Sequence, residues 1–122
     1  MKILFVCTSN KDRSPALAQY FSEKYPAMEF KSAGINKYFT EHHNTHLVNS
    51  ADVLWADYLV AAEMVHATYL ITRFKSELEG KRISVVVLDL GQFNESEKLV
   101  YLKQADEALT KFIFNSPIKN SK

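Results

Sequence analysis

Short apolar runs alternate along the chain with segments in which apolar residues recur at helical spacing. Four runs predict β-strands: Lys2–Val6, Met28–Ser32, Tyr58–Ala62 and Ile83–Leu88. The last two are almost continuously apolar, as is typical of strands that a parallel sheet buries on both faces. Met28–Ser32 instead alternates apolar and polar residues, which indicates a half-exposed strand.

The first segment between strands predicts an amphipathic helix. Leu17, Phe21 and Tyr25 follow one another at four-residue spacing and form one apolar face. Ser14 is a suitable N-cap for this helix. Pro26 marks its end, because proline cannot continue a helix.

Three later segments are predicted as helices on the same grounds. The second helix is centred on residues 47–55, and the third spans residues 65–78 and ends at Gly80. Asn94–Glu97 resembles a capping box and begins the last helix. Residues 33–40 are predicted as a turn and a polar loop. The alternation predicts an α/β fold with a parallel sheet and helices on both faces, and ligands bind such sheets beyond the carboxyl ends of the strands.

Length, composition and charge bound the class of protein. The chain has 122 residues, of which 47% are hydrophobic and 24% are charged, and its net charge is +1. We predict one domain over residues 1–115 and a frayed tail over residues 116–122. The small charge favours neither nucleic acid nor a membrane surface as a partner. The first apolar run is too short for a signal peptide, no segment approaches a membrane span, and the single cysteine excludes an internal disulfide. We therefore expect a cytoplasmic protein with a reduced thiol; its oligomeric state is left open.

The polar loop between the first predicted strand and the first predicted helix concentrates the chemistry. Cys7 stands at the strand end, and Arg13 follows six residues later at the helix start. A helix N-terminus presents unpaired N–H groups and a partial positive charge, which hold anions and favour a thiolate. The guanidinium group matches two oxygens of a phosphate-like anion. The loop therefore predicts a nucleophilic cysteine at a phosphate site; the alternative, an inert buried thiol, is weaker because of Arg13 and the helix start.

These residues resemble the low-molecular-weight protein tyrosine phosphatases, especially a short bacterial branch of predicted phosphatases. That family carries the pattern C-x5-R-S after its first strand, and Cys7, Arg13 and Ser14 match it. The resemblance extends over most of residues 2–90. The further matches are Asn10, Pro15, Ser32-Ala-Gly34, Trp55-Ala-Asp57, and Glu63-Met-Val-His66 with Leu70.

The resemblance implies a three-layer α/β/α fold with a four-stranded parallel sheet in the flavodoxin-like order 2-1-3-4. It also implies a phosphatase in which Cys7 attacks phosphorus and forms a cysteinyl-phosphate, while Arg13 and the loop N–H groups hold the remaining oxygens. The phosphate-binding residues would be Thr8, Ser9, Asn10, Lys11, Asp12, Arg13 and Ser14. The substrate would be a phosphorylated protein, phosphotyrosine above all, or a small phosphomonoester, with no metal and no other cofactor.

A carboxylic acid has to protonate the leaving oxygen, and here the chain departs from the family. The family places this acid after the fourth strand in an Asp-Pro-aromatic sequence, a position that falls on Gln92, which cannot deliver the proton in this way. Asp89 lies three residues earlier, beside the expected carboxyl end of the fourth strand, and is our candidate acid. Glu95 and Glu97 are weaker candidates, because carboxylates at a helix start also favour the helix dipole.

Asp12 is the second departure, at a position where many family members carry another cysteine. A carboxylate there would disfavour a thiolate and repel phosphate unless it points outward or pairs with Lys11. The single cysteine also argues against an arsenate reductase that relays the reaction through further thiols, although one that borrows an external thiol stays open. Ser14 has two open roles, a donor to the Cys7 thiolate and a plain helix cap.

Two further functions compete with an active phosphatase. A degenerate phosphatase that has lost its acid would bind phosphate or phosphoproteins without turnover. A phosphocysteine carrier of the sugar-transport type also places a cysteine after its first strand, but Arg13 at this spacing argues against it.

The segment before the second predicted helix carries histidines and aromatic residues. His42 and His46 lie four residues apart, as two metal ligands on one helix would, but no fourth ligand is evident and a solvated helix is the preferred interpretation. Tyr38 and Phe39 would border the site and help to choose the substrate by aromatic contact. Phe93 could serve similarly.

Glu63 and His66 match the short bacterial branch, but the pattern assigns them no chemistry. We expect Glu63 to be a charge at a helix start. We expect His66 to be a surface or capping histidine.

Overall fold

The computed structural model describes residues 1–114, so the predicted tail over residues 116–122 lies outside the described residues. The chain divides into two compact units, Met1–Gly91 and the part that begins at Gln92, and each is described by itself. The expectation of one domain over residues 1–115 stays a prediction.

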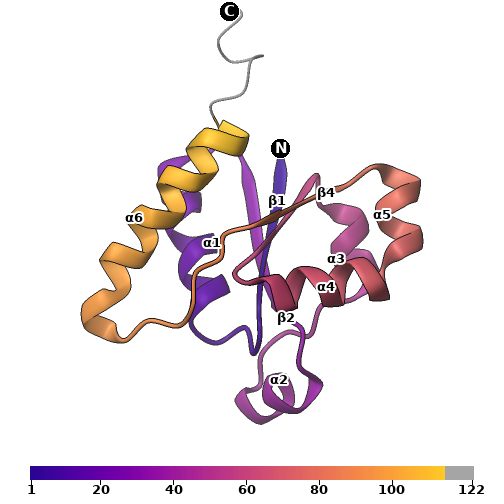
Figure 1. Cartoon of the computed structure of the whole chain (residues 1–122), viewed down its shortest axis with the longest axis horizontal. Coiled ribbons are helices and arrows are strands. Elements are labelled where there is room, and N and C mark those ends of the chain that lie inside the picture. The colour runs from indigo at the N-terminus through magenta and orange to yellow at the C-terminus, as the bar shows by residue number, and fades with distance from the viewer. Residues whose placement is uncertain (115–122) are drawn as a thin grey trace, which may run out of the picture. The chain divides into compact units, whose positions relative to one another are not determined.

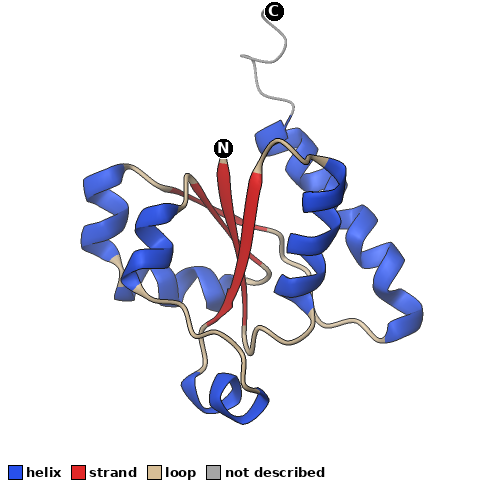
Figure 2. Ribbon diagram, turned by 180° about the vertical axis from the view of Figure 1, so that it is seen from behind, coloured by secondary structure: helices blue, strands red, loops and turns tan. Residues whose placement is uncertain are grey.

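A four-stranded parallel sheet forms the centre of the Met1–Gly91 unit (Figure 2). Its strands follow the order β2-β1-β3-β4, which confirms the predicted α/β fold class and strand order. In register, Cys7 pairs with Gly34, and Val6 pairs with both Ala33 and Ala61. The strands are β1 (Lys2–Cys7), β2 (Glu29–Gly34), β3 (Tyr58–Ala61) and β4 (Ser84–Val87).

Helix α1 (Arg13–Lys24) covers one face of this sheet through a cluster of aromatic rings. The ring of Phe21 stacks on that of Phe5 in β1, with centroids 5.6 Å apart, and Phe30 of β2 lies 6.0 Å from Phe5. The helix ends before Pro26, as predicted. It begins at Arg13 rather than after Ser14, so the prediction of Ser14 as N-cap is wrong: the first turn forms two residues earlier, with Asp12 at the N-cap position.

Three helices cover the opposite face of the sheet within the same unit (Figure 1). Leu4 and Val6 point to this face, since side chains alternate along a strand, and join a buried cluster with Leu59, Leu70 and Ile83. This unit therefore has the helix–sheet–helix layering that the alternating pattern predicts. The helices are α3 (Ser50–Trp55), α4 (Met64–Arg73) and α5 (Lys75–Lys81).

The structure has one helix and one helix break that the pattern did not predict. Residues 37–40 are predicted as polar loop, yet they begin α2 (Lys37–His43), which is capped at its start by the Asn36 side chain and ended by left-handed Asn44. The helix predicted over residues 65–78 is interrupted at Phe74. Gly80 lies inside α5, and the left-handed residue that ends α5 is Arg82, so the prediction that Gly80 ends the helix is wrong.

Strand β4 differs from the predicted burial as well. Its residues are exposed or half-buried, because β4 is an edge strand with a neighbour on one side only. The continuous run of valines therefore indicated a strand correctly but overstated its burial.

The part that begins at Gln92 is helical. The predicted capping box is confirmed, since the Asn94 side chain accepts from the Glu97 N–H and the Glu97 side chain accepts from the Asn94 N–H. Phe93 packs against Tyr101, with ring centroids 4.7 Å apart. No helix within residues 1–114 is both long and apolar enough to cross a membrane. The elements are η1 (Glu95–Glu97), α6 (Lys98–Leu109) and η2 (Thr110–Phe114), a π-helical turn.

Candidate active site

The loop between β1 and α1 lies at the carboxyl edge of the sheet, against the end of β2. The backbone oxygen of Thr8 accepts hydrogen bonds from the N–H groups of Ile35 and Asn36, both at 3.0 Å. Gly34 faces the loop so closely that a Cβ atom there would stand 2.7 Å from the Thr8 oxygen and 2.9 Å from the Asn10 nitrogen. A glycine is required at this position because the two backbones approach too closely for any side chain.

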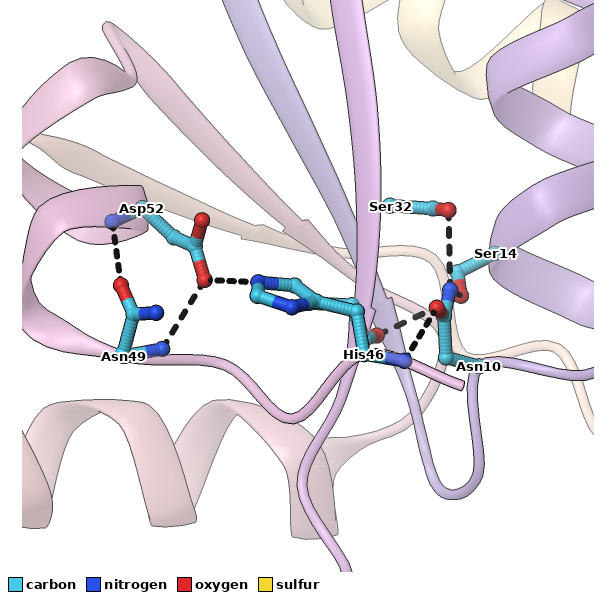
Figure 3. Close-up of polar contacts among 7 residues, drawn as sticks. Asn10, Ser14, Ser32, His46, Asn49 and Asp52 are labelled. Carbon is cyan, nitrogen blue, oxygen red and sulfur yellow. Dashed lines mark hydrogen bonds and ion pairs between the residues drawn. The ribbon is translucent and has the colours of Figure 1, made fainter. Parts of the chain in front are cut away.

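Asn10 organises the loop from within. It adopts a left-handed conformation, with φ 55°, which asparagine tolerates better than most residues. Its Nδ2 donates to Ser14 Oγ at 3.0 Å and to Ser32 Oγ at 2.8 Å, and its Oδ1 accepts from the His46 N–H at 3.2 Å (Figure 3). One buried side chain thus ties the loop to α1, to β2 and to the segment after α2.

Cys7 is buried, with 2% of its surface exposed. Its Sγ lies 3.1 Å from Ser14 Oγ, and either atom could be the donor. Ser14 Oγ accepts from Asn10 Nδ2 at 3.0 Å, and its own hydrogen has two neighbouring acceptors, the Cys7 sulfur and the Ala33 backbone oxygen at 3.3 Å. Ser14 is not the N-cap of α1, and its contact with the sulfur is compatible with the donor role, which stays a prediction.

Arg13 is also buried, with 4% exposed, and its guanidinium group is held by three neighbours. Nη1 lies 2.5 Å from Glu63 Oε2 and 3.4 Å from the Leu90 backbone oxygen, while Nη2 donates to Thr8 Oγ1 at 3.3 Å. These three contacts hold the guanidinium group in one orientation. The ion pair with Glu63 spans fifty positions of the sequence, and no local pattern predicts it.

His66 is a buried partner of the same loop. No part of it is exposed, so the expectation of a surface position is wrong, whereas the capping role is present: its Nδ1 accepts the Glu63 N–H at 3.0 Å. Its Nε2 lies 2.9 Å from Thr8 Oγ1. Burial, and secondarily the positive charge of Arg13, lowers the pKa of His66 to about 4, although Glu63 acts in the opposite direction. The match of Glu63 and His66 to the bacterial branch was the signal that could have assigned them to the site.

The remaining loop residues form the rim. Lys11 and Asp12 are exposed, and within residues 1–114 no ion pair joins them. The Asp12 carboxylate therefore remains in solvent, which is one of the two conditions under which it would tolerate a nearby anion. The Ser9 backbone oxygen accepts from the Thr45 hydroxyl at 2.5 Å and so ties the rim to the segment after α2.

Asp89 lies just beyond β4 in an unusual backbone conformation. Its φ is 59°, and its side chain is exposed. Leu88 N–H donates to the Ala61 oxygen and Leu90 N–H donates to the Ala62 oxygen, so two residue steps after β4 span one step after β3. Asp89 thus stands where the chain leaves the β3–β4 ladder, two residues beyond the last paired residue of β4. The other candidates belong to the second unit and are not placed relative to Cys7: Gln92, Glu95 and Glu97.

Helix α2 projects from the same edge of the sheet (Figure 1). Tyr38 is 70% exposed and stacks against His42, with ring centroids 6.1 Å apart, and Phe39 is exposed as well. His46 instead contacts Asp52, at 2.6 Å from Nε2 to Oδ2. The two histidines considered as metal ligands therefore have different partners, and residues 1–114 hold no group of three or more His, Cys, Asp or Glu side chains placed to bind a metal ion.

The fold and the loop define a class of α/β proteins that carry a cysteine and an arginine on the turn after the first parallel strand. The chain is similar in structure to the tyrosine phosphatase AmsI of Erwinia amylovora (TM-score 0.71, 14% identity, covering 95% of this chain and 93% of that one). It is also similar to Vibrio vulnificus Wzb in complex with benzylphosphonate (TM-score 0.69, 18% identity, 94% and 98% covered). A third similar structure is the YwlE arginine phosphatase of Geobacillus stearothermophilus (TM-score 0.58, 24% identity, 89% and 86% covered).

These comparisons show that the chain has the fold of the low-molecular-weight protein tyrosine phosphatases. The resemblance predicted from the loop is thereby confirmed at the level of the fold. The sequence matches no family model and no curated protein.

Proposed function

We propose that the protein is a cysteine-dependent phosphatase that hydrolyses phosphotyrosine or a related phosphomonoester, on a protein or a small molecule, in the cytoplasm. One observation carries the proposal: the buried Cys7 sulfur lies 3.1 Å from Ser14 Oγ, on the loop that ends with the oriented guanidinium of Arg13. A thiolate at this point has a hydrogen-bond donor beside it, and an anion has the helix start and a cation.

The reaction proceeds in two displacements. The Cys7 thiolate attacks phosphorus and forms an S–P bond while the P–O bond to the leaving group breaks, and an acid gives its proton to the leaving oxygen. Water then attacks phosphorus, the conjugate base of the acid takes the proton of the water, and the S–P bond breaks to release inorganic phosphate and the thiolate. The loop N–H groups of residues 8–14 and the Arg13 guanidinium stabilise the charge on the three equatorial oxygens in both steps.

The acid in this proposal is Asp89. Its left-handed backbone supports the assignment, because strain at an exposed acidic residue beside the carboxyl edge of the sheet is typical of functional positions. The degenerate phosphatase is the second candidate function, and the presence of Gln92 at the family's acid position favours it. The two functions differ in turnover, not in phosphate binding.

A series of aryl phosphates whose phenols differ in acidity separates these candidates. We expect turnover of the most acidic phenol by the wild type, and loss of turnover with retained vanadate binding in Cys7→Ser. Asp89→Asn should lower kcat about a hundredfold for weakly acidic phenols and much less for strongly acidic ones, which leave without protonation. Glu95→Gln is the matched control at another carboxylate.

Equal activity of the wild type and Cys7→Ser would contradict the phosphatase. Vanadate binding without turnover of any phenol would establish the degenerate function instead. Phosphoarginine belongs in the same substrate panel, because one similar structure is an arginine phosphatase.

A further inference from the structure

The hydroxyl group of Thr8 is held in one orientation by two neighbours. His66 Nε2 lies 2.9 Å from Thr8 Oγ1, and Arg13 Nη2 donates to the same oxygen at 3.3 Å. A hydroxyl oxygen has two lone pairs and one hydrogen. The direction of that hydrogen therefore depends on which ring nitrogen of His66 carries a proton.

The proton on His66 is located by its second ring nitrogen. Nδ1 accepts the backbone N–H of Glu63 at 3.0 Å, and a nitrogen that accepts a hydrogen bond carries no hydrogen. The neutral ring therefore has its hydrogen on Nε2 and donates it to Thr8. Complete burial of the ring favours this neutral form, consistent with the lowered pKa of His66. Both lone pairs of Thr8 Oγ1 are then occupied, and its own hydrogen is left to be donated elsewhere.

The hydrogen-bond donors of Arg13 that these contacts leave unused also suit a phosphoryl group. Nη1 is engaged by Glu63 and the Leu90 oxygen, and one hydrogen of Nη2 goes to Thr8. Within the described residues this leaves Nε–H and the second Nη2 hydrogen, two donors on adjacent nitrogens that match two oxygens of a phosphoryl group. Thr8 is bound to that guanidinium and follows Cys7 directly in the chain.

We infer that the Thr8 hydroxyl donates a hydrogen bond to an oxygen of the phosphoryl group, and that His66 is a positioning residue that holds the hydroxyl in the donating orientation. The inference rests on the proposed phosphatase function and deepens it, since that function uses only the backbone N–H groups of the loop and Arg13. The first turn of α4 thereby becomes part of the site: Glu63 orients the arginine, and His66 orients the threonine.

Thr8→Val tests the hydroxyl with almost no change in shape. We expect kcat/KM for p-nitrophenyl phosphate to fall about ten- to hundredfold and the inhibition constant of orthovanadate to rise by a similar factor, because a hydrogen bond to a charged acceptor is lost. Thr8→Ser keeps the hydroxyl and should recover the rate to within a fewfold of the wild type. A folded Thr8→Val protein within twofold of the wild type in both readouts would overturn the inference.

The role of His66 is tested by two replacements and a double-mutant cycle. His66→Gln keeps an acceptor for the Glu63 N–H and a donor for Thr8, and it should retain most of the rate, whereas His66→Leu should lose about tenfold. In a Thr8→Val background, His66→Leu should cost less than twofold, because the group it positions is gone. Independent, additive losses at the two positions would overturn the positioning role. Thermal unfolding of each variant separates loss of fold from loss of chemistry.

Calorimetric titration with orthovanadate separates this inference from the proposed function. If the wild type binds orthovanadate but turns over no substrate, the proposed phosphatase function is wrong. The inference about Thr8 is then decided by whether Thr8→Val weakens orthovanadate binding and Thr8→Ser restores it. If the wild type turns over substrate and Thr8→Val is unchanged, the inference fails alone. A wild type that binds no orthovanadate overturns both.

Discussion

Asn10 is the residue on which the conformation of the loop most depends. It combines a left-handed backbone with hydrogen bonds to Ser14, Ser32 and the His46 backbone, and it is buried. In a loop without glycine, the Asn10 side chain provides hydrogen-bond partners for two hydroxyl groups and one backbone N–H.

Replacement of Asn10 separates backbone strain from the hydrogen bonds. Asn10→Gly keeps the backbone freedom and loses the bonds, whereas Asn10→Ala loses both. We expect Asn10→Ala to be less stable than Asn10→Gly by about 1 kcal/mol, and Asn10→Gly to be less stable than the wild type by about 1–3 kcal/mol. Urea unfolding measures both differences. Equal stability of the two variants would show that strain at this position is negligible.

His66 makes stability depend on pH. Its pKa in the folded protein is about 4, below the ordinary 6.5, so between these values the unfolded chain binds a proton that the folded chain does not. Stability is therefore complete above about pH 6.5 and falls with pH, by about 1.4 kcal/mol per pH unit from this group, until the folded pKa is reached.

His66→Gln should remove this contribution. We expect the difference in unfolding free energy between wild type and variant to decrease from pH 7 to pH 4 by roughly 3 kcal/mol, as the wild type loses stability and the variant is spared. The carboxylates that titrate in the same range are common to both proteins and cancel. A difference that stays constant over this range would mean that His66 is protonated as easily in the folded protein as in the unfolded one.

At the scale of elements, the end of β2 supports the loop by close approach. Gly34 pairs with Cys7 in the sheet, and the nearest atoms to its missing Cβ all belong to the backbone of residues 8–10. Backbone atoms cannot move aside as the end of a flexible side chain can. The position of the loop is therefore set by a strand that carries none of the groups proposed to react.

Two glycine replacements test this support. Gly34→Ala should displace the loop, lower kcat/KM at least tenfold and destabilise the protein by about 2 kcal/mol, because a Cβ would stand 2.7 Å from the Thr8 oxygen. Gly80→Ala is the matched control: nothing lies within 4 Å of its Cβ, and alanine in helix α5 should stabilise the protein by up to about 1 kcal/mol. Initial rates and urea unfolding check both. Normal activity of Gly34→Ala would show that the loop can move away from a Cβ atom at this position without loss of kcat/KM.

At the scale of the whole molecule, the sheet of the Met1–Gly91 unit carries a different core on each face. The face under α1 is dominated by stacked aromatic rings, with Phe21 at their centre, and the opposite face by aliphatic side chains. Because α1 begins with Arg13, the aromatic core also holds the helix that carries the Arg13 guanidinium group.

Phe21→Ala should therefore cost both stability and activity. Removing a completely buried phenylalanine typically destabilises a domain by about 3–5 kcal/mol, a large part of a total near 5–15 kcal/mol. Phe21→Leu should cost clearly less, since it leaves a smaller cavity. Denaturant unfolding with rates measured on the remaining folded fraction distinguishes the two effects. A loss below 1 kcal/mol in Phe21→Ala would contradict the packing described for this face.

The sequence by itself determined the strands, the strand order through the family resemblance, and the residues of the loop. These features are local: apolar periodicity reports which faces are buried, and C-x5-R-S reports a turn from a strand to a helix. It also identified Asp12 and Gln92 as departures from the family. The break at Phe74 escaped the periodicity, because a helix that stops and restarts keeps nearly the same apolar spacing.

Only the tertiary structure decided how the site is assembled. Glu63 reaches Arg13 across fifty sequence positions, and His66 reaches Thr8 across fifty-eight, because β1 and β3 are neighbours in a parallel sheet and end at the same edge. A charged residue and a histidine also occur at the start of many surface helices that belong to no functional site, so their presence there does not indicate a site. The register of the sheet turns both residues toward the loop and buries His66 there, and this register cannot be read from their own segment of the sequence.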